Sequence, residues 1–232
     1  MNATLLRTEI ERKIPCAFQA YRRAEHGSIR TGIAQIDDAV QGAPLRALTE
    51  ICGNWSSSGK TSVLLSLLAQ ATRDHFCALV DASDSFDPGS GQAAGICLPR
   101  LLWVRCGKNR VKLPPVEQAF KVADILLQSS GFGLIAVDLG GVPESVVRRV
   151  PLSLWFRFSR VVEKQSAALV FIEQEPHATS CAGLVLRVMT EAPAFVGNLI
   201  TQCNLKIEVA RGREKKPVRS ERAGFSLRMQ WA

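Results

Sequence analysis

Short, uniformly apolar segments alternate with helix-length segments, and this alternation most constrains the fold of the chain. Residues 134–137 and 168–172 are of strand length and contain no polar residue. An amphipathic stretch at 154–164 lies between them. Strands that are apolar on both sides are buried on both faces, as in parallel sheets covered by helices. The pattern predicts an α/β fold with a mainly parallel, twisted sheet and helices on both faces.

The same alternation runs through the preceding part of the chain. Strands are predicted at 48–52, 77–80 and 101–105, and helices at 61–73 and 117–130. A further strand is expected at 168–173, which closes with Glu173.

The last part of the chain has a different pattern. Residues 205–210 and 225–231 alternate between apolar and polar side chains, which predicts an antiparallel hairpin around 211–222. We therefore expect an N-terminal helical extension (1–26), a core (27–204) and a basic C-terminal β-hairpin (205–232).

Composition narrows the class of protein. Lysine and arginine outnumber aspartate and glutamate by 29 to 21, a net charge of +8 that suits a polyanionic partner. No apolar stretch approaches the roughly 20 residues of a membrane helix, and the first residues do not resemble a secretory signal. The seven cysteines form no C-x-x-C pair, so we expect neither a zinc site nor disulfides, and a cytoplasmic location.

A glycine- and serine-rich segment follows the first strand and precedes a helix. It contains Gly53, Ser58, Gly59, Lys60 and Thr61 in the context of a phosphate-binding loop. The loop pattern requires glycine at position 54, where this chain has asparagine. Two interpretations follow: a loop that still binds phosphate, or a structural turn between strand and helix.

Aspartates close two of the buried strands. Asp138 follows 134–137 and Asp81 follows 77–80. In phosphate-loop proteins such an aspartate and the loop threonine hold Mg²⁺, here Asp138 and Thr61. We expect Lys60 and Asp138 to meet at the carboxyl ends of adjacent strands.

These pieces, in this order, resemble the core of the RecA family over about residues 30–175. The resemblance implies ATP and Mg²⁺ as cofactors, and a glutamine that couples nucleotide to the DNA-binding loops, here Gln174. The matching segments are Thr31-Gly32-Ile33, the loop from Glu50 to Thr61, Asp81-Ala82, Glu117-Gln118-Ala119 and Phe171-Ile172-Glu173-Gln174.

The departures from the family pattern concern the nucleotide. The family's catalytic glutamate corresponds to Ser83, which cannot act as a carboxylate base. The aromatic ring that stacks on adenine in the family corresponds to Ser90. Asp84 would point to the opposite side of the strand end. We assign no catalytic residue and expect weak or absent ATP hydrolysis.

The segments corresponding to the family's DNA loops are short: 140–153, with Arg148 and Arg149, and 175–181. This arrangement, with shortened loop segments, resembles the ImuA group. These are RecA-like accessory proteins of mutagenic translesion synthesis and are related to SulA. That resemblance implies a role in the response to DNA damage and, as partners, ImuB, an error-prone polymerase and RecA itself. Self-association remains open.

The tip of the predicted hairpin is strongly basic. Residues 211–222 contain six cations against two glutamates. They would either follow a phosphate backbone or form a solvated loop that discourages edge pairing. The candidate DNA-binding residues here are Arg211, Arg213, Lys215, Lys216 and Arg219.

Aromatic and basic residues also alternate near position 155. Trp155, Phe156 and Phe158 with Arg157 and Arg160 are compatible with base stacking among cations. Their helical spacing favours core packing instead.

Three functions compete. The leading hypothesis is a DNA-binding repair accessory protein with little ATPase activity. The rivals are an active DNA-dependent ATPase of the RecA class and a cell-division inhibitor of the SulA kind.

Overall fold

The computed structural model describes residues 27–54, 58–107, 113–129, 131–196, 199–212 and 223–228. The predicted extension at 1–26 lies outside these residues, as does most of the loop between β9 and β10.

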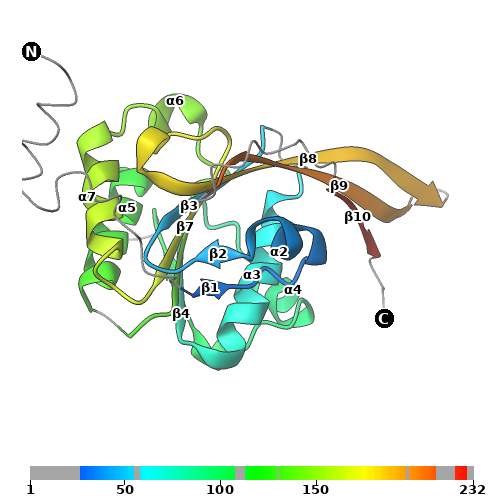
Figure 1. Cartoon of the computed structure of the whole chain (residues 1–232), viewed down its shortest axis with the longest axis horizontal. Helices are drawn as coiled ribbons and strands as arrows, with labels where there is room; N and C mark the ends of the chain where they lie inside the picture. The colour runs from blue at the N-terminus through cyan, green and yellow to red at the C-terminus, as the bar shows by residue number, and fades with distance from the viewer. Residues whose placement is uncertain are drawn as a thin grey trace, which may run out of the picture.

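An eight-stranded sheet forms the centre of the molecule, in the order β10-β9-β8-β3-β7-β6-β4-β5 (Figure 1). The pairs from β8 through β3, β7, β6 and β4 to β5 are parallel, whereas β8, β9 and β10 pair antiparallel. The mainly parallel α/β fold is confirmed. The strands are β3 (Leu48–Cys52), β4 (Cys77–Asp81), β5 (Leu101–Arg105), β6 (Leu134–Asp138), β7 (Ala168–Glu173), β8 (Ala182–Val196), β9 (Leu199–Arg211) and β10 (Ala223–Arg228).

Helices cover both faces of the sheet, and successive strand residues explain why (Figure 1). Ala136 and Val170 pack with the helix α3, while Val137 and Phe171 pack with α5 and α7. Alternate residues therefore enter different cores, and each strand must be apolar on both sides. The helices are α2 (Ala34–Val40), α3 (Lys60–Asp74), α4 (Pro88–Ala93), α5 (Pro115–Ser129), α6 (Glu144–Val147) and α7 (Leu152–Val162).

Smaller elements complete the fold. The strands β1 (Ser28–Ile29) and β2 (Ala43–Pro44) form a separate two-stranded sheet beside α2. The 3-10 turns are η1 (Leu98–Arg100) and η2 (Thr179–Cys181).

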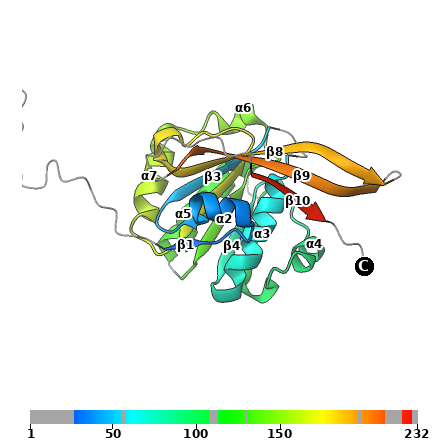
Figure 2. The same cartoon turned by 45° about the vertical axis from the view of Figure 1, so that its right-hand side comes forward.

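The C-terminal part of the sheet begins earlier in the chain than the sequence pattern predicts. The strand β8 was not expected, and β9 starts at Leu199, so it crosses the expected domain boundary at residue 204. Pro193 interrupts the alternation of β8, where the β8–β9 ladder shifts register between Glu191 and Ala194. A bulge admits proline to a paired strand. The resulting hairpin extends away from the core in both views (Figures 1 and 2).

None of the helices in the described ranges combines the length and the apolar character that spanning a membrane requires.

Candidate phosphate site and surrounding charged residues

The end of β3 and the start of α3 form the centre of the candidate site. Gly59 is the N-cap of α3 with a φ of 88°, a left-handed conformation that favours glycine. A Cβ at this position would also collide with the side chain of Leu205 from β9. Gly53 is likewise packed against Ser58 and the Val188 carbonyl oxygen. The loop therefore requires glycine at both positions, and β8 and β9 pack against it.

Lys60 opens α3 and is 4% exposed. Its Nζ donates a hydrogen bond of 2.9 Å to the carbonyl oxygen of Gly53. Burial lowers the pKa of Lys60, whereas the neighbouring Asp138 acts in the opposite direction. The lysine amine is held inside the loop, where an outer phosphate is bound in proteins with this motif.

Lys60 and Asp138 meet over Gly140. A Cβ on Gly140 would lie 2.8 Å from Lys60 Cε and 3.0 Å from Asp138 Oδ1. The expected meeting of the two side chains is confirmed, but the expectation that their strands are adjacent is wrong. The strand β7 lies between β3 and β6. Spatial strand order depends on how a later segment inserts into the sheet, which the local pattern does not encode.

Asp138 is 6% exposed and accepts a hydrogen bond of 2.8 Å from the Gly140 backbone N–H. Burial is the main cause that raises the pKa of Asp138, and the neighbouring Asp81 raises it further. Lys60 and the Gly140 N–H favour its charged form.

Asp81 pairs in register with Asp138 and is fully buried. Its carboxylate organises the turn after β4, because it accepts several hydrogen bonds there. The donors are the backbone N–H groups of Ser83 (3.2 Å), Ser85 (3.1 Å) and Phe86 (2.9 Å) and the Trp103 indole (3.3 Å).

Ser83 lies beside this aspartate pair. A Cβ on Gly141 would be 2.7 Å from Ser83 Oγ, and this hydroxyl is buried without a hydrogen-bond partner among the described residues. Asp84 does not replace the missing carboxylate, because it forms an ion pair with Arg105 of β5. That strand lies on the side of β4 away from β6.

The residues fit a phosphate group and a divalent cation better than they fit a whole nucleotide. Ser58 Oγ is buried without a partner among the described residues, so a donor is available beside the loop. Thr61 is exposed in the first turn of α3. Ser90 is exposed, and its backbone N–H donates to the side chain of Asp87, which caps α4. It offers no surface on which adenine could stack.

Gln174 connects the end of β7 to the segment after β6. Its Nε2 donates a hydrogen bond of 3.0 Å to the carbonyl oxygen of Val142.

A buried acidic cluster that the sequence reasoning missed lies behind this edge. Glu50 and Glu173 are fully buried, on the neighbouring strands β3 and β7. Glu50 Oε1 accepts the backbone N–H groups of His177 (2.6 Å) and Ala178 (2.7 Å). His177 Nδ1 and Glu173 Oε2 share a hydrogen bond of 2.6 Å. The signal in the sequence was a lone glutamate inside each of two buried strands.

Burial controls the ionisation of this cluster. It raises the pKa of Glu50, although the His177 and Ala178 N–H groups oppose it. It raises the pKa of Glu173 to about 7. The hydrogen bond to Glu173 raises the pKa of His177. One oxygen of each glutamate lacks a hydrogen-bond partner in the described part of the chain.

The predicted DNA-binding residues fall into two groups. Arg148 and Arg149 are exposed at the end of α6, and Arg211 is exposed at the end of β9, where it donates to the Thr179 carbonyl oxygen at 2.5 Å. Arg213, Lys215, Lys216 and Arg219 lie outside the described residues.

Comparison with known proteins gives a consistent match. The model of the RecA N-terminal domain matches residues 18–148. A protein RecA from Desulfotalea psychrophila is 30% identical over 164 residues, which cover 63% of this chain and 44% of that protein. One from Rickettsia africae is 33% identical over 130 residues (54% and 34%). One from Ectopseudomonas oleovorans is 38% identical over 113 residues (47% and 30%). The chain spans less than half the length of these relatives.

Proposed function

The chain belongs to the RecA family, and from this premise we propose that it is a DNA-repair accessory protein of the ImuA kind. In this role it binds DNA and hydrolyses ATP weakly or not at all. The proposal includes action in the cytoplasm during the response to DNA damage, alongside ImuB, an error-prone polymerase and RecA.

The observation that carries this proposal is that Ser83 lies beside the aspartate pair Asp81 and Asp138. Hydrolysis needs a base that polarises the attacking water, and Ser83 supplies none. Asp84 is the nearest carboxylate in sequence, and it is held by Arg105. Asp138 lies beside Lys60, whose charge favours the ionised carboxylate, and this pairing suits charge balance.

The phosphate loop keeps a reduced role in this proposal. Gly53, Ser58 and Gly59 would contact a phosphate through the loop, and Lys60 would exchange its bond to Gly53 for a phosphate oxygen. Thr61 and Asp138 would hold Mg²⁺, with Asp81 supporting Asp138 and Gln174 sensing the state of the site. Bound Mg²⁺ would neutralise phosphate charge.

DNA would be held by cations outside this site. Arg148 and Arg149 project from the short segment after β6, and Arg211 marks the start of the basic segment. Phosphate contacts by arginine and lysine release counterions and need no base recognition. The remaining members of this set are Arg213, Lys215, Lys216 and Arg219.

Steady-state ATPase assays with and without single-stranded DNA test the proposal against an active RecA-class ATPase. We expect turnover at background level, and no change on Lys60→Ala. Turnover that DNA stimulates and Lys60→Ala abolishes would favour the rival. A Ser83→Glu variant restores the missing carboxylate, and a gain of turnover in it would support the proposed cause of the inactivity.

Binding assays complete the test. Isothermal titration with ATP and Mg²⁺ is expected to show millimolar affinity at best. A gel shift with DNA that survives moderate salt is expected, and its absence would favour a protein inhibitor of the SulA kind.

A further inference from the structure

The exposed face of α7 combines an aromatic ring with cations that the core does not use. Trp155 and Phe158 are fully buried against Phe120 and Phe171, with ring centroids 4.8 to 6.1 Å apart. Phe156 lies between them in sequence but is 43% exposed. Core packing therefore explains two of the three neighbouring aromatic residues and leaves Phe156 unexplained.

Cations surround this ring. Phe156 and Arg160 are four residues apart in α7, which places them along one side of the helix axis, and Lys164 follows just after the end of the helix. All three are exposed, and with Arg157 and Val161 they line a groove of about 390 Å³. Arg157 is paired with Asp124 at 3.2 Å, so its charge is partly balanced.

A second, open groove continues from the first toward the sheet. It has a volume of about 700 Å³ and lies between α7, residues 180–183 and the end of β9. Phe156 and Arg160 line both grooves, and Arg211 lines the second. Glu163 is the acidic residue of its lining. We call the surface formed by Phe156, Arg157, Arg160, Lys164 and Arg211 the α7 groove.

The basic segment of the chain starts at this groove. Gly212 belongs to the lining, and the next ten residues carry five further cations and two glutamates. The described lining carries the cations Arg157, Arg160, Lys164 and Arg211 against the acid Glu163, so its charge suits a polyanion.

The α7 groove is separate from the phosphate loop. The helix α7 packs on the face of the sheet opposite to α3, whose first turn carries Lys60. The groove residue Ala182 pairs with Leu48 at the start of β3, whereas the phosphate loop follows the end of β3. No described residue of the phosphate loop lines either groove.

We propose that the α7 groove binds single-stranded nucleic acid, and that this binding does not depend on a nucleotide in the phosphate loop. The inference rests on the DNA binding in the proposed function and gives it a location and a strand preference. An exposed aromatic ring stacks on unpaired bases, while flanking cations contact the backbone. In a duplex the bases are already stacked on one another, so the ring would have no partner.

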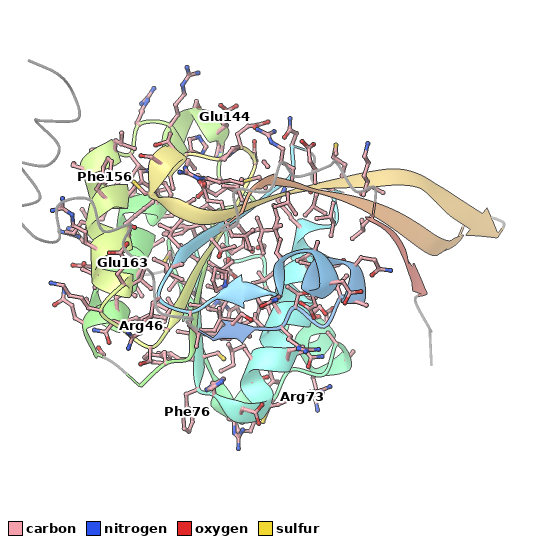
Figure 3. The ribbon with its side chains drawn as sticks, in the orientation of Figure 1. Arg46, Arg73, Phe76, Glu144, Phe156 and Glu163 are labelled. Atoms are coloured by element: carbon pink, nitrogen blue, oxygen red, sulfur yellow. The ribbon has the colours of Figure 1, made fainter. Side chains whose placement is uncertain are left out.

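The first experiment measures the fluorescence anisotropy of a labelled oligothymidylate of about 20 nucleotides. We expect Phe156→Ala to weaken binding about tenfold, in the range of one stacked base. Phe76→Ala is the matched control, because Phe76 is 61% exposed and lies far from α7 (Figure 3). Equal affinities of these two variants would overturn the proposal.

The electrostatic part is tested with Arg160→Ala. We expect the slope of log affinity against log salt to fall by about 0.7, the value for one phosphate contact on a single strand. Arg73→Ala is its control, since Arg73 is exposed near Phe76 (Figure 3). Glu163→Gln removes the acid that lines the groove, and we expect tighter binding. A slope for Arg160→Ala that equals the Arg73→Ala slope would contradict the assignment, as would unchanged binding of Glu163→Gln.

The preference for single strands and the independence from nucleotide are tested by separate affinity measurements. Affinity is expected to be the same with and without ATP and Mg²⁺ and in Lys60→Ala, and weaker for a duplex of equal length. A requirement for nucleotide, or equal affinity for the duplex, would overturn the proposal. Displacement of the oligonucleotide by an oligoglutamate peptide of equal charge would identify an acidic-protein surface instead.

The two proposals can fail separately. If the wild-type protein binds no DNA, both fail. If it binds oligothymidylate and the α7 variants do not differ from their controls, DNA binding stands and only the α7 groove is wrong. Thermal unfolding of each variant shows that lost binding does not reflect lost folding.

Discussion

Glu173 Oε2 lies 2.6 Å from His177 Nδ1, and this contact joins the end of β7 to the turn that follows it. Glu173 is fully buried and the His177 side chain is 12% exposed. The neighbouring Glu50 holds the same turn by accepting the N–H groups of His177 and Ala178. The turn after β7 is therefore fixed to the core at several points.

This cluster predicts that stability falls as the pH rises. The pKa of Glu173 is raised from 4.5 to about 7, so between these values the folded protein binds more protons than the unfolded chain. The pKa of His177 is also raised in the folded protein. The stability that this shift contributes is present below pH 6.5 and is lost as the pH rises through the folded pKa. Both groups therefore make stability fall as the pH rises. We expect the free energy of unfolding to decrease by an amount on the order of 2 kcal/mol between about pH 5 and pH 8.

Urea unfolding across this pH range measures the effect, with Glu173→Gln as the comparison. Glutamine keeps an acceptor for the His177 Nδ1–H but does not ionise, so the variant is expected to lose much of the slope. A variant with the same pH profile as the wild type would contradict the assignment. Glu50→Gln provides a second test, because burial raises the pKa of Glu50 in the same direction.

The neighbouring aromatic residues of α7 are expected to differ sharply in their effect on stability. Phe158 is fully buried and its ring lies 5.6 Å from that of Phe120. Replacing it with alanine removes buried area and leaves a cavity, so Phe158→Ala should cost about 4 kcal/mol. Phe156→Ala should cost less than about 1 kcal/mol, since this side chain is largely in solvent. Equal shifts in the urea midpoint would show that the helix face is wrongly assigned.

Gly59 and Leu205 are expected to be energetically coupled. Gly59→Ala imposes a positive φ on a residue with a Cβ, and the new methyl group collides with Leu205. We expect a loss of about 2 kcal/mol. In the Gly59→Ala/Leu205→Ala double variant the collision is relieved, so its destabilisation should be smaller than the sum of the two single changes. Strict additivity in the double-mutant cycle would place the hairpin away from the loop.

Asp81 is expected to be essential for folding, whatever its role toward a cofactor. Asp81→Ala leaves the partly buried donors of Ser83, Ser85, Phe86 and Trp103 without their acceptor, at a cost of about 3 kcal/mol. Asp81→Asn keeps one acceptor oxygen and should cost less. The emission of Trp103 offers a local readout, because its indole N–H donates to Asp81. Wild-type stability in both variants would show that these bonds contribute little.

Local pattern was sufficient wherever burial alone decides the structure. The bounds of β3, β5 and β7 follow the sequence prediction because each strand is a short, mainly apolar run that ends at a polar residue or a turn. The phosphate-loop context of Lys60 and the position of Asp138 were also predictable, since strand ends and helix starts carry short-range signals.

Other features depended on contacts between distant segments. Strand β8 was missed because Pro193 breaks its alternation, and only its partner β9 stabilises it there. The order of the strands was misjudged because β7 inserts between β3 and β6. The cluster of Glu50, Glu173 and His177 was missed because Glu50 lies more than a hundred residues before the other two in the chain.

The sequence by itself determined the layered α/β architecture, because the two-residue period of a strand and the 3.6-residue period of a helix depend only on residues close together in the chain. It also places Ser83 where the resemblance to the RecA family implies a catalytic glutamate. Only the tertiary structure decided which side chains share a site: that Lys60 reaches Asp138 across an intervening strand, and that Phe156 faces solvent while Trp155 and Phe158 face the core. Such choices depend on which surfaces remain uncovered after all the elements have packed, and no short window of sequence contains that information.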